Sequence, residues 1–103
     1  AYRLTDDRIT EKVVDRPDRW NLLVAHVVLP PGEALPPHPT NADVFLVVVR
    51  GALTLKVGEE PAVLYTKGQI VHLPHRTPMS ASNEGCETLE FFVLKTPHPE
   101  RHA

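Results

Sequence analysis

The sequence is poor in cysteine, in aromatic residues and in long apolar runs. Cys86 is the single cysteine of the 103 residues. An internal disulfide is therefore excluded, which fits a reducing compartment. The longest apolar run, Val44–Val49, is far too short to cross a bilayer as a helix. We therefore expect a cytoplasmic protein with no membrane partner.

Neither sign of charge dominates the chain. The 11 basic and 13 acidic residues give a formal net charge of -2, and the two kinds are mixed along the sequence. A nucleic-acid-binding surface needs a concentration of Lys and Arg, so we expect no nucleic-acid partner. The length allows one domain with one hydrophobic core, and residues 1–103 are taken as that domain.

Stretches compatible with a helix are also missing. There are 11 prolines, and each candidate helical window is crossed by proline or glycine or is dominated by valine. Instead, Val- and Leu-rich stretches recur between turn residues about every 8–12 residues, which is typical of a β-sandwich or barrel. We predict an all-β fold of seven or eight strands and a loose tail from about residue 96. The candidate strands are Ile9–Val14, Trp20–Leu29, Val44–Val49, Ala52–Val57, Ala62–Thr66, Gln69–Leu73, Met79–Asn83 and Thr88–Lys95.

Two blocks of the chain share one plan, in which a turn glycine is followed by a proline-bearing loop and a strand-forming run. The first block spans residues 32–51 and the second spans residues 68–83. Their spacing resembles the two motifs of the cupins. The first motif is Gly, five residues, His-x-His, three or four residues, Glu, six residues and Gly. In this sequence Gly32, His38 and Gly51 match it.

The second cupin motif is Gly, five residues, Pro-x-Gly, two residues, His, three residues and Asn. Gly68, Pro74 and Asn83 match it. The resemblance covers about half of the chain and implies a double-stranded β-helix, the jelly-roll barrel of this family. It does not specify an activity, because such barrels carry many chemistries.

The resemblance also implies a metal site, but most of the expected ligands are replaced. Cupins hold their metal with two histidines and a carboxylate from the first motif and a histidine from the second. His38 keeps the first position, while Thr40, Val44 and Met79 occupy the other three. Asp43 is one residue away from the carboxylate position, and a one-residue offset on a strand turns a side chain to the other face unless a β-bulge restores its direction. If a divalent transition metal binds at all, we expect His38 with His72 to hold it.

The remaining histidines have weaker claims to a function. His72 shares a strand face with Ile70 and reaches the barrel interior if that face points inward. His26 lies among apolar residues and is expected to be a hydrogen-bonded core or interface histidine. His75 is expected to face solvent, and His98 and His102 belong to the tail.

Three hypotheses for the function follow. The first is a metal-free protein that binds a small organic ligand in an apolar pocket lined by His38, Thr40, Val44, His72 and Met79. The second is a metal-dependent oxygenase or isomerase with a non-standard ligand set. The third is a structural or partner-binding barrel. The apolar strand at residues 20–29 and the resemblance together imply a homodimer.

Overall fold

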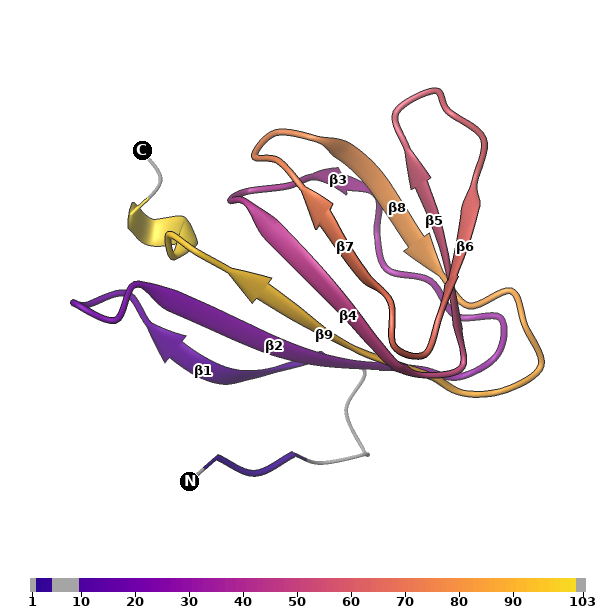
Figure 1. The fold of residues 1–103 in the computed structure, drawn as a ribbon, viewed down its shortest axis with the longest axis horizontal. Coiled ribbons are helices and arrows are strands. Elements are labelled where there is room, and N and C mark those ends of the chain that lie inside the picture. Colours follow the sequence, from indigo (N-terminus) through magenta and orange to yellow (C-terminus); the bar gives the residue numbers. More distant parts are fainter. Residues whose placement is uncertain (1, 5–9, 102–103) are drawn as a thin grey trace.

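The Val- and Leu-rich stretches form β-strands, as expected of side chains that pack well on a pleated surface. The computed structural model describes residues 2–4 and 10–101 (Figure 1). In that part of the chain, nine strands precede one short turn of 3-10 helix. The elements are β1 (Thr10–Arg16), β2 (Leu22–Leu29), β3 (His38–Pro39), β4 (Val44–Arg50), β5 (Ala52–Val57), β6 (Val63–Thr66), β7 (Ile70–Leu73), β8 (Pro78–Ser82), β9 (Leu89–Lys95) and η1 (Pro99–Arg101).

The strands form two antiparallel sheets. One has the order β1-β2-β9-β4-β7, and the other has the order β3-β8-β5-β6. In Figure 1 the strands of the two sheets converge toward the lower right and diverge toward the upper left. The all-β prediction is confirmed. The sequence did not predict β3, a two-residue strand that pairs His38 with Met79 of β8.

The inward faces of the two sheets make the hydrophobic core. Strand β4 alternates, with Val44, Leu46 and Val48 buried between more exposed neighbours. Leu53 and Leu55 of β5 meet them from the other sheet as part of the same buried cluster. Because successive strand residues point to opposite faces, this pattern fixes which residues of the paired strands point inward.

The chain reverses sharply between β4 and β5, where the backbone requires glycine. Gly51 has a φ of 76°, in the left-handed region that residues with a Cβ rarely adopt. A Cβ there would also collide with the backbone oxygen of Thr88 and lie 3.0 Å from the Cα of Leu89. The close approach of β5 to the start of β9 therefore depends on the missing side chain.

A second left-handed position is filled by a larger residue. Arg76 stands two residues after Pro74, where the second motif has glycine, and its φ is 66°. The backbone conformation of the motif is thus kept although the glycine is not. A non-glycine residue in this conformation carries a strain of roughly 1–2 kcal/mol.

The expected strand at residues 20–29 begins two residues late. The Asp18 side chain accepts a hydrogen bond from the Trp20 amide at 3.1 Å, and Asn21 has a φ of 53°. This turn leaves the Trp20 side chain 59% exposed, with the guanidinium of Arg19 5.2 Å from the ring centroid. The Asp18 carboxylate also hydrogen-bonds Arg16 and raises the pKa of that guanidinium.

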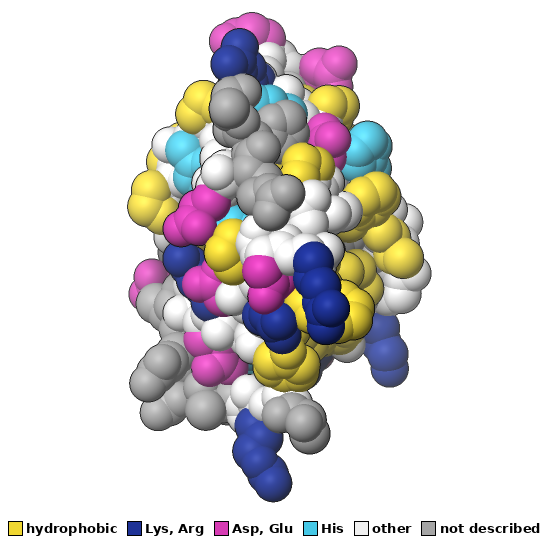
Figure 2. Space-filling view, turned by 90° about the vertical axis from the view of Figure 1, so that its left-hand side faces the viewer, with side chains coloured by type: hydrophobic (Ala, Val, Ile, Leu, Met, Phe, Trp, Pro, Cys, Tyr) yellow, Lys and Arg dark blue, Asp and Glu magenta, His cyan; other side chains and the backbone are white. Residues whose placement is uncertain are grey.

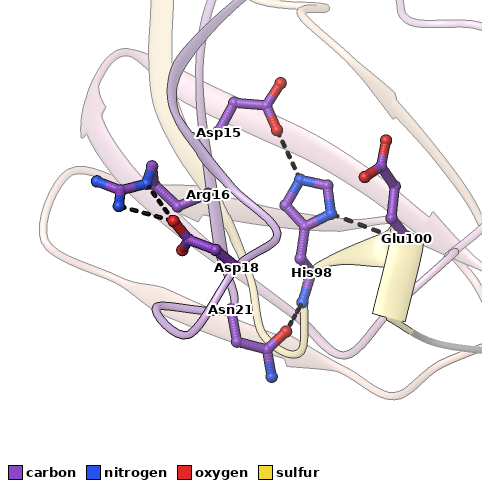
Figure 3. Close-up of polar contacts among 6 residues, drawn as sticks. All are labelled: Asp15, Arg16, Asp18, Asn21, His98 and Glu100. Carbon is purple, nitrogen blue, oxygen red and sulfur yellow. Dashed lines mark hydrogen bonds and ion pairs between the residues drawn. The ribbon is translucent and has the colours of Figure 1, made fainter.

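The prediction of a loose tail from residue 96 was wrong for the residues that the structure describes. His98 is only 4% exposed, and its amide donates to the side-chain oxygen of Asn21 at 2.8 Å. Its ring accepts from the Glu100 amide through Nδ1, so Nε2 carries the proton that it donates to Asp15 at 2.6 Å (Figure 3). The ring of His98 therefore ties the tail to β1, and its backbone amide ties the tail to the turn before β2. His102 lies outside the described residues.

The surface carries charges of both signs. On the face shown in Figure 2, acidic and basic side chains lie among hydrophobic ones. The described part of the chain contains no helix that is long and apolar enough to cross a membrane.

Candidate functional site

A cavity of about 200 Å³ lies between the two sheets. Its walls are mostly aliphatic and aromatic side chains of β2, β4, β8 and β9. Four of the predicted site residues line it, namely His38, Thr40, Val44 and Met79, and Lys95 joins them. Alternation along the strands brings these residues together, since Lys95 pairs with Val44 across β9 and β4 and His38 pairs with Met79.

His38 contributes a hydrogen-bond acceptor to the cavity. Its Nδ1 lies 2.8 Å from the carbonyl oxygen of Pro39. Because a carbonyl only accepts, Nδ1 carries the proton, and Nε2 of the neutral ring has a free lone pair. The side chain is exposed, so a ligand can reach it at the edge of the cavity.

Thr40 lines the cavity, but its hydroxyl is used elsewhere. Oγ1 donates to the Pro74 carbonyl at 2.6 Å and accepts from the Thr77 amide at 2.8 Å. Asp43 holds the same loop, because its carboxylate accepts from the His75 amide at 2.9 Å. The residue at the second histidine position therefore fixes the loop between β7 and β8, and its hydroxyl is not a free polar group for a ligand.

Lys95 is the site residue that the sequence reasoning missed. It is half-buried at the end of β9, and its ammonium donates to the Asn41 side-chain oxygen at 2.7 Å. Burial, with a smaller contribution from the nearby charge of Lys12, lowers the pKa of Lys95. A signal was present, because Leu89, Phe91 and Val93 share a face that continues to Lys95 at the same two-residue period.

His72 was predicted to line the pocket, but the structure places it outside the cavity. Leu73 pairs with the inward-facing Val44, so its neighbour His72 points to the opposite face of the sheet. There its ring stacks on Phe45 with the centroids 4.7 Å apart. His72 is thus unable to share a ligand or a metal ion with His38.

Other ionisable groups lie away from the cavity. His26 is fully buried on the outer side of the sheet, and its Nε2 lies 2.7 Å from Glu90, which also pairs with Arg50. A wider depression of about 830 Å³ lies at the other end of β4 and β9, around Arg50, Cys86 and Glu90. It is open to solvent and borders neither His38 nor Lys95.

The double sheet and its motif loops correspond to a known family. Residues 25–95 match the model of the cupin domain, which is more than half of the chain. This protein belongs to the cupin family. The sequence resemblance and the double-stranded β-helix are both confirmed.

Relatives of this cupin support the same assignment. The uncharacterised protein MJ0764 of Methanocaldococcus jannaschii is 35% identical over 101 residues, which cover 98% of this chain and 87% of that protein. Its crystal structure, described as an RmlC-like cupin with a double-stranded β-helix fold, superposes with a TM-score of 0.89 at 34% identity and covers 98% of this chain and 93% of that one. The cupin-like protein TM1010 of Thermotoga maritima has a TM-score of 0.79 at 25% identity, covering 85% and 67% of the two chains.

Cupins often bind a metal ion, and the residues of this cavity do not fit one. His38 is the only imidazole among the described lining residues, while the Thr40 hydroxyl is bonded to the loop and Val44 has no donor atom. No group of three or more His, Cys, Asp or Glu that could hold a metal occurs among the described residues. The Lys95 ammonium at the same wall would repel a cation. One imidazole beside a fixed positive charge is a poor metal site.

Proposed function

We propose that this cupin domain binds a small organic molecule in the cavity and does so without a metal ion. The observation that supports this most directly is a mostly apolar cavity whose ionisable groups, His38 and Lys95, stand among largely aliphatic walls. Such a lining suits a ligand that has an apolar body and one or two polar ends. The volume of about 200 Å³ is below the roughly 300–1,000 Å³ of pockets for drug-sized molecules, so the ligand is small.

A neutral probe tests whether the cavity takes an apolar guest. We expect 1-hexanol, titrated into ¹⁵N-labelled protein, to shift the amide resonances of Val44, Met79 and Val93, which border the cavity. Met79→Trp should fill the space and abolish these shifts, while Leu64→Trp, on an exposed residue of β6, should leave them intact. A folded wild-type protein that shows no shifts, or equal shifts in Met79→Trp, would contradict the proposal and favour a purely structural barrel.

Metal analysis separates this proposal from a metal-dependent oxygenase or isomerase. We expect mass spectrometry of protein without a tag to find well under one transition-metal ion per chain. One ion per chain that disappears in His38→Ala would overturn the metal-free proposal. His75→Ala, whose histidine lies in the loop between β7 and β8 and outside the cavity lining, is the matched control.

A homodimer is part of the proposal. The outer face of the five-stranded sheet carries Phe45, Val47 and Ile70, with Ile70 66% exposed and Phe45 37% exposed. Leu94 and Phe92 of β9 lie beside Phe45 and Val47 on that face. An apolar sheet face of this kind can pair with its own copy around a two-fold axis. A cytoplasmic location and the lack of nucleic-acid and membrane partners remain predictions from the sequence.

A further inference from the structure

The last residue of β9 places a cation next to the position of one of the family's metal ligands. Lys95 pairs with Leu23 on β2 and with Val44 on β4, and it lines the cavity with both neighbouring strands beside it. Val44 stands at the position of the family's carboxylate ligand. The carboxylate that would neutralise a bound metal ion is therefore absent, and an ammonium group stands next to its position.

The Lys95 ammonium has neutral or positively charged groups close to it. None of the described residues that line the cavity is acidic. The hydrogen-bond partner of Lys95, Asn41, is a neutral amide, and Lys12 adds a second positive charge close enough to disfavour the protonated form of Lys95. On β1, Asp15 pairs with Leu23, which is the neighbour of Lys95 on β2. The Asp15 carboxylate is bonded to His98. The positive charge of Lys95 thus has no anionic partner in these contacts.

The other ionisable group that lines the cavity is His38, which is less suited than Lys95 to bind an anion. In its neutral form the His38 ring offers an acceptor at Nε2, which suits a donor such as a hydroxyl and repels a carboxylate oxygen. Burial lowers the pKa of Lys95, and an anion beside the ammonium would relieve that unfavourable burial. Recognition of a charged ligand therefore depends on Lys95.

We propose that the cavity binds a small amphipathic carboxylate, whose apolar part lies among the aliphatic walls and whose carboxylate group pairs with the ammonium of Lys95. This inference rests on the proposed function and narrows it to one chemical class. In this arrangement a covalently attached cation replaces the metal ion as the positive charge of the barrel interior. A carboxylate accepts a charge-assisted hydrogen bond from the ammonium, which is stronger than a bond between neutral groups.

The test compares hexanoate with 1-hexanol, which has the same carbon chain without the charge. We expect hexanoate to bind about tenfold more tightly at neutral pH, the scale expected for one charge-assisted hydrogen bond. Lys95→Met keeps the length and apolar character of the stem, so it should retain hexanol binding and lose the preference for hexanoate. Lys56→Met, which changes an exposed lysine of β5 outside the cavity lining, should bind like wild type.

The outcomes distinguish this inference from the proposed function. If hexanol and hexanoate bind equally well, the cavity takes small molecules but Lys95 does not select carboxylates, and the inference fails alone. If the preference for hexanoate survives in folded Lys95→Met, the inference is likewise overturned. If neither probe binds folded wild-type protein, the proposed function fails as well. Loss of the preference in Lys95→Met together with its retention in Lys56→Met supports both.

Discussion

At the scale of single residues, Arg76 holds a conformation that its motif assigns to glycine. Its φ of 66° is strained for a residue with a Cβ, and its side chain is exposed. We predict that Arg76→Gly raises the free energy of unfolding by about 1 kcal/mol, because the strain is removed at a modest entropic cost in the unfolded chain. Urea denaturation measures the change.

Arg76→Ala is the control for this prediction. It removes the guanidinium but keeps the Cβ and therefore the strain. Stabilisation in Arg76→Gly without stabilisation in Arg76→Ala would locate the effect in the backbone. Equal effects in the two variants would contradict the strain argument and assign the change to the lost charge.

Lys95 gives a prediction for pH dependence. Its pKa is lowered in the folded protein from an ordinary value of 10.5, mainly by burial. Between the lowered value and 10.5 the unfolded chain binds more protons, so this group makes the folded protein more stable as the pH rises. At pH 7 Lys95 is protonated in both the folded and the unfolded state, so the folded protein bears the full free-energy cost of burying the ammonium.

We therefore predict that Lys95→Met is more stable than wild type at pH 7 and that its advantage shrinks as the pH approaches 10.5. Urea midpoints measured from pH 7 to 10.5 give the difference, with Lys56→Met as the reference for a solvent-exposed lysine. An advantage that stays constant or grows with pH would contradict the lowered pKa as its source.

At the scale of elements, the loop between β7 and β8 is held by side chains of the segment that joins β3 to β4. Thr40 bonds the Pro74 carbonyl and the Thr77 amide, and Asp43 bonds the His75 amide. We predict that Thr40→Val destabilises the protein by about 1–3 kcal/mol, because it leaves the part-buried Thr77 amide without its hydrogen-bond acceptor. Hydrogen exchange of the Thr77 amide should also become faster.

Thr77→Val is the matched control. The Thr77 hydroxyl makes a single bond to the same carbonyl from a more exposed position, so its loss should cost less. If Thr77→Val destabilises the protein as much as Thr40→Val, the special role of Thr40 in fixing the loop is refuted.

The sequence was sufficient to predict most of the strands and part of the site. Why a prediction succeeded or failed differs from one element to the next. Strand β5 alternates strictly, and its predicted and observed bounds are both Ala52–Val57. In β7, one face carries Ile70 and His72 and the other carries Val71 and Leu73. Both faces offer apolar side chains, so the sequence does not decide which way His72 points. Only the pairing of Leu73 with Val44 decides it. The buried His98 was missed because its partners are 77 and 83 residues away in sequence.

At the scale of the whole molecule, the two sheets present different outer faces. That of the five-stranded sheet carries Phe45, Val47 and Ile70, whereas that of the other sheet carries polar residues such as Thr54 and Lys56 beside Leu64. We predict a dimer through the five-stranded sheet. Ile70→Glu should convert it to a monomer in analytical ultracentrifugation, because a pair of copies would bury two unpaired carboxylates.

Leu64→Glu tests the specificity of this interface. Leu64 is 60% exposed, close to the 66% of Ile70, but it lies on the other sheet. The dimer should survive this change. A wild-type protein that sediments as a monomer, or a dimer lost only in Leu64→Glu, would contradict an interface on the five-stranded sheet.

The anchored tail has a practical consequence for anyone who purifies this protein. Arg101, the last residue of η1, follows Lys95 by six residues, so at about 3.5 Å per extended residue a peptide fused behind η1 starts within roughly 21 Å of Lys95 in the cavity wall. A polyhistidine tag at that end is long enough to reach His38 and to hold nickel there as an artefact of affinity chromatography. Measurements of bound metal therefore belong on protein from which such a tag has been cleaved.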